Sequence, residues 1–178
     1  MPIDIVSYSE DTHYVNSVYV DANLIINCRN RKADKYNEAV MLLGSLIRQH
    51  INLYISNLVI DEVWWILLKA WYRQRTGDNL YPYILKKNPS IVQDYSSLIE
   101  KVTTKILRFP NIYIIENTQN GKDFIRDVLS IFTAEQFGPR DSFHLGLTIA
   151  HNIQGFVTCD GDFDNLNLPN YNLIVYKY

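Results

Sequence analysis

Four acidic residues in this chain stand where an α/β fold places its chemistry: Asp21, Glu62, Asp141 and Asp160. Asp21 and Asp160 each follow an apolar run directly, at the carboxyl end of a predicted strand, where an open α/β sheet builds its active site. Glu62 and Asp141 fall in the first turns of predicted helices that begin at the same edge. Several carboxylates in one crevice repel one another unless a cation stabilises them. The pattern predicts a divalent-metal site suited to phosphodiester hydrolysis.

Taken singly, each of these acids also fits a purely structural role. Asp21 and Asp141 could cap helices, and Glu62 could be a solvated residue favoured by the helix dipole. Asp160 precedes Gly161, and Asp-Gly is a common turn pair. Four independent roles of this kind have no reason to fall on one rim of a sheet, so we interpret the acids as one cluster.

The elements that must position these acids alternate between strands and helices. Apolar runs predict five strands, at 17–20, 52–55, 112–115, 156–158 and 173–176. Helical spacing predicts helices over about 33–50, after an N-cap at Ser56, from Pro89 to the stop at 109–111, and over about 122–132 and 141–151. Residues 76–89 look like a loop with one short helical turn. The alternation predicts an α/β fold with a mostly parallel five-stranded sheet and helices on both faces.

Composition and charge limit the domain organisation and the classes of function that the chain can have. The chain has 178 residues, 47% of them hydrophobic, which suits one domain with a sizeable core. We expect an N-terminal extension over 1–16 and a single domain over 17–178. The net charge of −2 argues against a protein that coats nucleic acid by charge alone. The chain shows no Gly-rich phosphate loop, no leader segment and no apolar run long enough to span a bilayer, so we expect a cytoplasmic protein.

The two cysteines, Cys28 and Cys159, lie far apart in the sequence. Two widely spaced thiols form neither a disulfide framework nor a zinc site. We interpret them as small, partly buried apolar residues of a reducing compartment.

Four segments, in order, resemble the motifs of the PIN-domain nucleases. They are Val-Tyr-Val-Asp-Ala-Asn-Leu-Ile at 18–25, Ser-Asn-Leu-Val-Ile-Asp-Glu-Val at 56–63, Pro-Arg-Asp-Ser-Phe-His-Leu at 139–145 and Val-Thr-Cys-Asp-Gly-Asp-Phe at 157–163. The resemblance covers roughly residues 17–178, and the subgroup that looks most similar is the VapC-type toxins of toxin–antitoxin pairs. The chain departs from the family at Ala22, where members often carry Ser or Thr.

The resemblance implies a PIN-like three-layer fold and a nuclease that hydrolyses RNA phosphodiesters, leaving a 5′-phosphate. Oxygen ligands favour Mg²⁺ or Mn²⁺. We assign all four acids to catalysis and the metal site, with Asp21 and Asp160 as direct ligands and Glu62 and Asp141 acting directly or through water. Asn23 and Thr158 are assigned as hydrogen-bonding groups that fix the carboxylates, and Asp162 is a further candidate for the metal site, although a turn role before Phe163 is favoured for it. For His144, a buried, hydrogen-bonded role is favoured over that of a base.

Partners and substrate contacts follow from the same resemblance and from the cations near the motifs. Arg29, Arg31, Lys32 and Arg140 are candidates for phosphate contacts, with solvated surface charge as the alternative for each. Residues 73–87 interleave tyrosines with cations, as single-stranded RNA sites do, and a surface loop or a dimer contact is an equal alternative for this segment. The implied partners are an RNA substrate and a small antitoxin protein, and a homodimer stays open. Two alternatives to the toxin are a housekeeping RNA-processing nuclease and a non-catalytic scaffold that binds RNA or protein.

Overall fold

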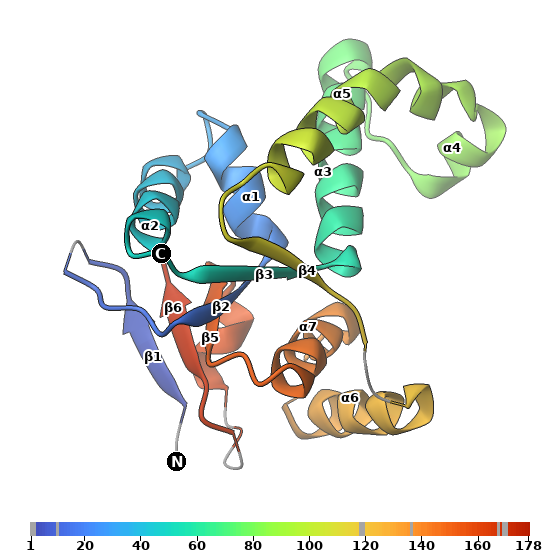
Figure 1. Ribbon diagram of the computed structural model, residues 1–178. Helices are drawn as coiled ribbons and strands as arrows, with labels where there is room; N and C mark the ends of the chain where they lie inside the picture. The colour runs from blue at the N-terminus through green and yellow to red at the C-terminus, as the bar shows by residue number, and fades with distance from the viewer. Residues whose placement is uncertain (1–2, 10, 118–119, 136, 167, 169–170) are drawn as a thin grey trace.

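Six strands form one parallel sheet in the computed structural model, which describes residues 3–9, 11–117, 120–135, 137–166, 168 and 171–178 (Figure 1). The strands lie in the order β1-β6-β5-β2-β3-β4, and all neighbours pair in parallel. Their bounds are β1 Asp4–Ser7, β2 Ser17–Val20, β3 Asn52–Ser56, β4 Ile112–Ile115, β5 Gly155–Thr158 and β6 Ile174–Lys177. The carboxyl ends of β2 and β5, which are paired neighbours, therefore meet at one edge of the sheet.

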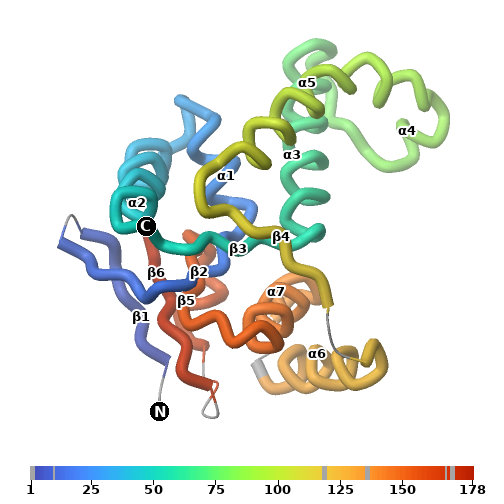
Figure 2. The backbone as a smooth tube through the Cα atoms, in the orientation of Figure 1, coloured from blue at the N-terminus to red at the C-terminus, as the bar shows by residue number. Residues whose placement is uncertain are grey.

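Helices cover both faces of this sheet (Figure 2). They are α1 Ala22–Arg29, α2 Tyr36–Arg48, α3 Asn57–Thr76, α4 Pro82–Lys87, α5 Ser90–Leu107, α6 Gly121–Glu135 and α7 Pro139–Ala150, with a short 3₁₀ turn, η1, at Gly161–Asn165. Strand alternation separates the faces, because Val20 lines a pocket under α1 and α2 while Tyr19 reaches His144 of α7. The predicted α/β class with helices on both faces is confirmed.

The structure adds elements that local pattern did not reveal. The sheet has six strands where five were predicted. The additional strand is β1, which lies within the segment 1–16 that was expected to be an extension and which pairs with β6. Most of β1 is exposed, so it lacks the apolar run that marks the other strands. Asp21 is followed at once by α1, and the expected short helical turn in 76–89 is α4. Within the described residues, no helix is both long enough and apolar enough to cross a membrane.

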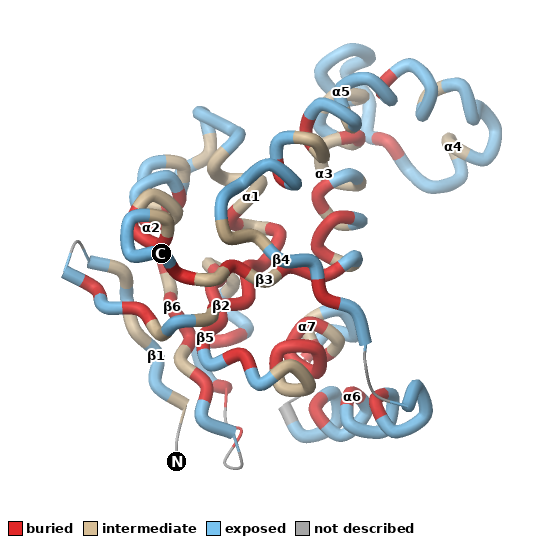
Figure 3. Tube along the Cα trace, in the orientation of Figure 1, coloured by how far each residue is buried: buried red, intermediate tan, exposed pale blue. Residues whose placement is uncertain are grey.

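The core lies between the sheet and its two helical layers (Figure 3). Close packing depends on small residues at two places. A Cβ on Gly155 would lie 2.6 Å from Val18 Cγ1, and a Cβ on Gly146 would lie 2.7 Å from Val128 Cγ2. The second contact lets α7 pack tightly against α6, and most of α7 is buried as its apolar composition predicts. This packing holds the first turn of α7 at the carboxyl edge of the sheet.

A second, smaller core lies away from the sheet, where α3, α4 and α5 project beyond the body of the molecule (Figure 1). Leu68, Leu80 and Tyr95 are its buried residues. We call residues 65–95 the helical arm. Most of its surface is exposed (Figure 3).

Candidate metal centre

Asp21 is a buried carboxylate at the end of β2. Only 7% of its surface is exposed, and it makes no capping hydrogen bond to α1, so a helix-capping role does not explain it. Its Oδ2 instead accepts hydrogen bonds from Thr158 Oγ1 at 2.9 Å and Asn23 Nδ2 at 3.0 Å. Burial raises the pKa of Asp21, and the nearby charge of Glu62 adds to that rise. Thr158 and Asn23 therefore orient a carboxylate that is costly to ionise.

Glu62, on α3, lies beside Asp21 and faces His144, which is on α7. His144 Nε2 is 3.4 Å from Glu62 Oε2, and Arg140 Nη1 is 3.3 Å from Glu62 Oε1. Burial alone would raise the pKa of Glu62, but His144 and Arg140 outweigh it and lower that pKa. Glu62 is thus held as a carboxylate at the rim, as expected for a residue outside the apolar stripe of α3.

His144 belongs to this site more closely than its sequence context indicated. It is 2% exposed, and its Nδ1 lies 2.7 Å from the Tyr19 hydroxyl, which in turn lies 2.6 Å from Ser56 Oγ. Ser56 stands at the N-cap of α3 as predicted, but its hydroxyl bonds Tyr19 and not the helix. The buried Nε2 of His144 has no partner with hydrogen-bond geometry in the described part of the chain. Its 3.4 Å contact with Glu62 is an ion-pair distance only.

These groups fit a cation. One ligand atom from each of Asp21, Glu62 and His144 lies within 4.8 Å of the other two, the single such group that the described residues form. Two carboxylates and an imidazole are metal ligands, and the orphaned Nε2 points to a missing partner. The donor set therefore suits a divalent metal ion.

Asp141 and Asp160 stand next to this group but outside it. Burial, and then the charge of Asp160, raise the pKa of Asp141 to about 6, and the charge of Asp21 contributes in the same direction. The Oδ1 of Asp160 accepts a hydrogen bond from the Asp162 backbone N–H at 3.0 Å, so the turn role considered for Asp160 is present. The mutual charge effects place the acids near one another, and their catalytic assignment remains a prediction.

The supporting residues divide into near and far sets. Thr158 and Asn23 bond Asp21 directly, and the charge of Asp162 also raises the pKa of Asp141. Arg140 bridges Glu62 and the exposed Asp61, at 3.6 Å from the latter. By contrast, Arg29 ends α1, and Arg31 and Lys32 lie in the turn beyond it, one helix length from Asp21. Phosphate contacts by these cations stay predictions.

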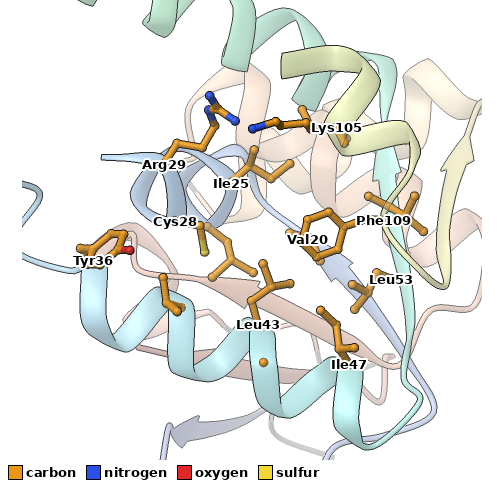
Figure 4. Close-up of a pocket in the computed structure, with 15 residues that line it drawn as sticks. Val20, Ile25, Cys28, Arg29, Tyr36, Leu43, Ile47, Leu53, Lys105 and Phe109 are labelled. Carbon is orange, nitrogen blue, oxygen red and sulfur yellow. The ribbon is translucent and has the colours of Figure 1, made fainter. Parts of the chain in front are cut away.

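An apolar pocket of about 460 Å³ lies on the opposite face of the sheet from α7 (Figure 4). Val20 and Leu53 line it from the sheet, and side chains of α1, α2 and α5 complete its walls. Arg29 and Lys105 stand together at one side, with their nitrogens close in the view. Among the residues that the structure describes, no carboxylate lines this pocket, so it is separate from the metal centre and suits an apolar group with a negative charge nearby.

Comparisons with known proteins agree with this architecture. Residues 18–168 match the family model described as the PIN domain. The crystal structure of Mycobacterium tuberculosis VapC20, a sarcin-ricin loop cleaving toxin, aligns with a TM-score of 0.53 and 16% identity over 83% of this chain and 93% of that one. VapBC2 from Rickettsia felis, bound to a DNA fragment from its promoter, aligns with a TM-score of 0.50 and 18% identity over 89% and 96%. No curated protein matches in sequence. At these identities the two structures support the fold.

Proposed function

The chain belongs to the PIN-domain family, and from this premise we propose that it is a divalent-metal-dependent ribonuclease and the toxin of a toxin–antitoxin pair. The observation that carries the proposal is the group of Asp21, Glu62 and His144 beside Asp141 and Asp160 at the carboxyl edge of the sheet. Asp21 is buried, and its side-chain donors, Thr158 and Asn23, are both neutral. A cation is the missing counter-charge.

Asp21, Glu62 and His144 would hold Mg²⁺ or Mn²⁺, with Asp141 and Asp160 beside them. The role of Asp160 as a direct ligand stays a prediction. When bound, such an ion supplies a Lewis acid that neutralises charge on the scissile phosphate and activates water for attack. Thr158 and Asn23 keep the Asp21 carboxylate in one orientation, and Tyr19 fixes the ring of His144 through Nδ1.

Asp141 and Arg140, neighbours on the first turn of α7, would serve the substrate. The pKa of about 6 at Asp141 lies close to neutral pH, so its carboxylate is suited to accept a proton from the attacking water. Arg140 pairs with Glu62 and Asp61 in the free protein, and a phosphate that enters the site would compete with those carboxylates for its guanidinium. This exchange would bring the phosphodiester to the edge of the metal centre.

The similar structures described above are those of the toxin VapC20 and of VapBC2. The apolar pocket supplies a surface on which a partner protein could dock. Its apolar walls would take side chains of an acidic, amphipathic antitoxin segment, with Arg29 and Lys105 pairing the acids. This surface lies away from the metal centre, so binding there and cleavage can be altered separately.

A cleavage assay tests the enzyme. We expect wild-type protein to cut unstructured RNA with Mg²⁺ or Mn²⁺, EDTA to stop the reaction, and Asp21→Asn to lose it. The matched control is Asp127→Asn, which removes one exposed carboxylate from α6 and should cleave normally. Equal activity of Asp21→Asn and wild type would overturn the assignment, and a metal-insensitive reaction would overturn the metal dependence. A protein that binds RNA but does not cleave it would favour the scaffold alternative.

A binding assay tests the antitoxin. If a short reading frame beside the gene encodes the partner, its purified product should bind wild-type protein. Val40→Asp places a charge in the pocket and should abolish the complex, whereas Met41→Asp alters the next residue of α2, which is equally exposed but outside the pocket. Loss of binding by both variants, or by neither, would contradict this docking surface.

A further inference from the structure

The helical arm concentrates positive charge in a chain whose net charge is −2. Residues 65–95 contain five cations and two acids, so the rest of the chain, with twelve cations and seventeen acids, is distinctly negative. One of the two arm acids, Asp94, is already paired with Arg75 at 3.5 Å. The other cations of the arm are Lys69, Arg73, Lys86 and Lys87. The arm is therefore a local site for a polyanion.

Two tyrosines at the start of α4 lie stacked and exposed. Tyr81 and Tyr83 are 49% and 59% exposed, and their rings lie 5.9 Å apart at only 10° to one another. The small core of the arm is filled by Leu68, Leu80 and Tyr95, so it does not require these rings. Flat aromatic faces left in solvent are surfaces on which nucleobases stack.

A groove of about 560 Å³ begins at Tyr81 and runs along α3. Trp65 and Tyr81 line it together with Lys69 and Arg73. Lys69 Nζ lies 5.4 Å from the centre of the Trp65 ring, and Lys87 Nζ lies 6.0 Å from that of Tyr83. Aromatic walls beside ammonium and guanidinium groups form a site where a base stacks while its phosphates are neutralised.

The arm is preorganised for such a ligand. Trp71 and Tyr95 stack at 6.2 Å, and the Tyr95 hydroxyl donates to the Trp71 carbonyl oxygen at 3.3 Å. Gly77 ends α3 with a φ of 82°, a left-handed conformation that glycine adopts without strain. Because α3 and α5 are already packed together, binding need not order the groove first.

We propose that the helical arm is a binding platform for single-stranded RNA, with a base between Trp65 and Tyr81 and the backbone along Lys69, Arg73 and the α4 lysines. This inference deepens the proposed ribonuclease function and rests on it. Glu62 and Arg73 lie eleven residues apart on α3, which corresponds to roughly 16 Å along the helix. The arm would therefore hold nucleotides that flank the scissile bond, several positions away.

Fluorescence anisotropy with a labelled, unstructured 12-nucleotide RNA tests the arm without any cleavage. All variants are made in the Asp21→Asn background and measured in EDTA. We expect Tyr81→Ala/Tyr83→Ala to weaken binding about tenfold, since stacked bases are lost. Lys69→Ala/Arg73→Ala should lower the slope of log affinity against log salt by about 1.4, as two phosphate contacts disappear.

Two controls separate the aromatic faces from general damage. Tyr113→Ala removes a stacked, 48% exposed tyrosine from β4, outside the arm, and should bind RNA like its parent. Tyr81→Phe/Tyr83→Phe keeps both rings and should restore affinity to within about twofold. An RNA duplex should bind more weakly than the single strand, because its bases are not free to stack.

The outcomes distinguish this inference from the proposed function. Unchanged affinity in the tyrosine and cation variants overturns the arm as an RNA platform, even if wild-type protein cleaves RNA. Tight, arm-dependent binding supports the platform even if no cleavage is found. If the tyrosine variant instead converts a dimer to a monomer in sedimentation with RNA affinity unchanged, the surface is a contact between copies and the inference is wrong.

Discussion

Helix α3 joins two regions that use charge in opposite ways. Its first turns carry Glu62 into a buried, negative cluster, and its last turns carry Arg73 into an exposed, positive arm. In the cluster, burial raises the pKa of Asp21 and Asp141, so their ionised forms are costly without a counter-charge. In the arm, exposed cations stay solvated at little cost and are available to phosphates. One region thus suits the reaction, and the other suits holding the strand that reacts.

The largest effect is expected from Asp21→Asn, because it removes the charge of the most buried carboxylate of the cluster. Its kcat should fall by roughly 10²–10³-fold, the range seen when one preorganised charge-stabilising group is lost. Its KM should stay within about twofold, since the arm is intact. Single-turnover and steady-state kinetics on one RNA measure both values. A KM effect as large as the kcat effect would break the division between the two regions.

Metal binding should stabilise the fold through the cluster alone. At Mg²⁺ or Mn²⁺ concentrations about 100-fold above Kd, mass action adds about 2.7 kcal/mol, or roughly 5–10 °C in Tm for a domain of this size. Asp21→Asn should lose this rise, and Tyr81→Ala/Tyr83→Ala should keep it. Differential scanning fluorimetry in EDTA and in metal measures both. A rise that survives in Asp21→Asn would mean that the ion binds elsewhere.

The tyrosine pair should affect catalysis only through substrate binding. In an otherwise active protein, Tyr81→Ala/Tyr83→Ala should raise KM about tenfold and leave kcat within about twofold. Extending the RNA should lower KM for wild type more than for this variant, because only wild type gains arm contacts. A fall in kcat with unchanged KM would show that the arm acts on the chemical step.

The smallest effect concerns the pH dependence of stability at Asp141. Its folded pKa of about 6 lies above the value of 3.8 taken for an unperturbed Asp, so the folded state binds the proton more tightly. Stability is therefore lost as pH rises from about 4 to about 6. Without metal, Asp141→Asn should be about 1–2 kcal/mol more stable than wild type at pH 7.5 and nearly equal at pH 4. Urea unfolding in EDTA at both pH values measures the difference, and an equal difference at both would contradict the raised pKa.

The secondary structure that could be predicted was the part with strong periodicity. The run ending at Asp21 became β2 with its predicted bounds, and the mostly apolar helix at 141–151 became the buried α7, which begins two residues earlier. The strand at 4–7 was missed, because its pairing with β6 leaves most of its side chains exposed and no apolar alternation marks it. Pairing between residues so far apart in the chain carries no local signal.

The four acids of the candidate site could be named from the sequence, and their catalytic roles stay predictions, whereas their geometry could not be predicted. His144 is a polar residue in the apolar helix α7, one turn beyond Asp141, and this position could have marked it as part of the site. A histidine that only makes hydrogen bonds within the core would look the same in the sequence. The structure shows both features at once: His144 bonds Tyr19 through Nδ1 and presents Nε2 to Glu62. Ser56 likewise differs from its predicted role as a helix cap. Its hydroxyl makes a hydrogen bond with Tyr19 of the neighbouring strand and none with the start of α3.

Local order along the chain was enough to predict the α/β class, the positions of Asp21 at a strand end and of Asp141 at a helix start, and the mixture of tyrosines and cations in the arm. These are properties of neighbouring residues and of their periodicity. Glu62, expected in the first turn of its helix, lies in the second turn of α3. Only the packing of α3 and α7 against the sheet decided that His144 joins Asp21 and Glu62, and only the packing of α3 with α5 raised the arm away from the body. Distances between side chains many residues apart depend on how whole elements pack, and no local pattern encodes them.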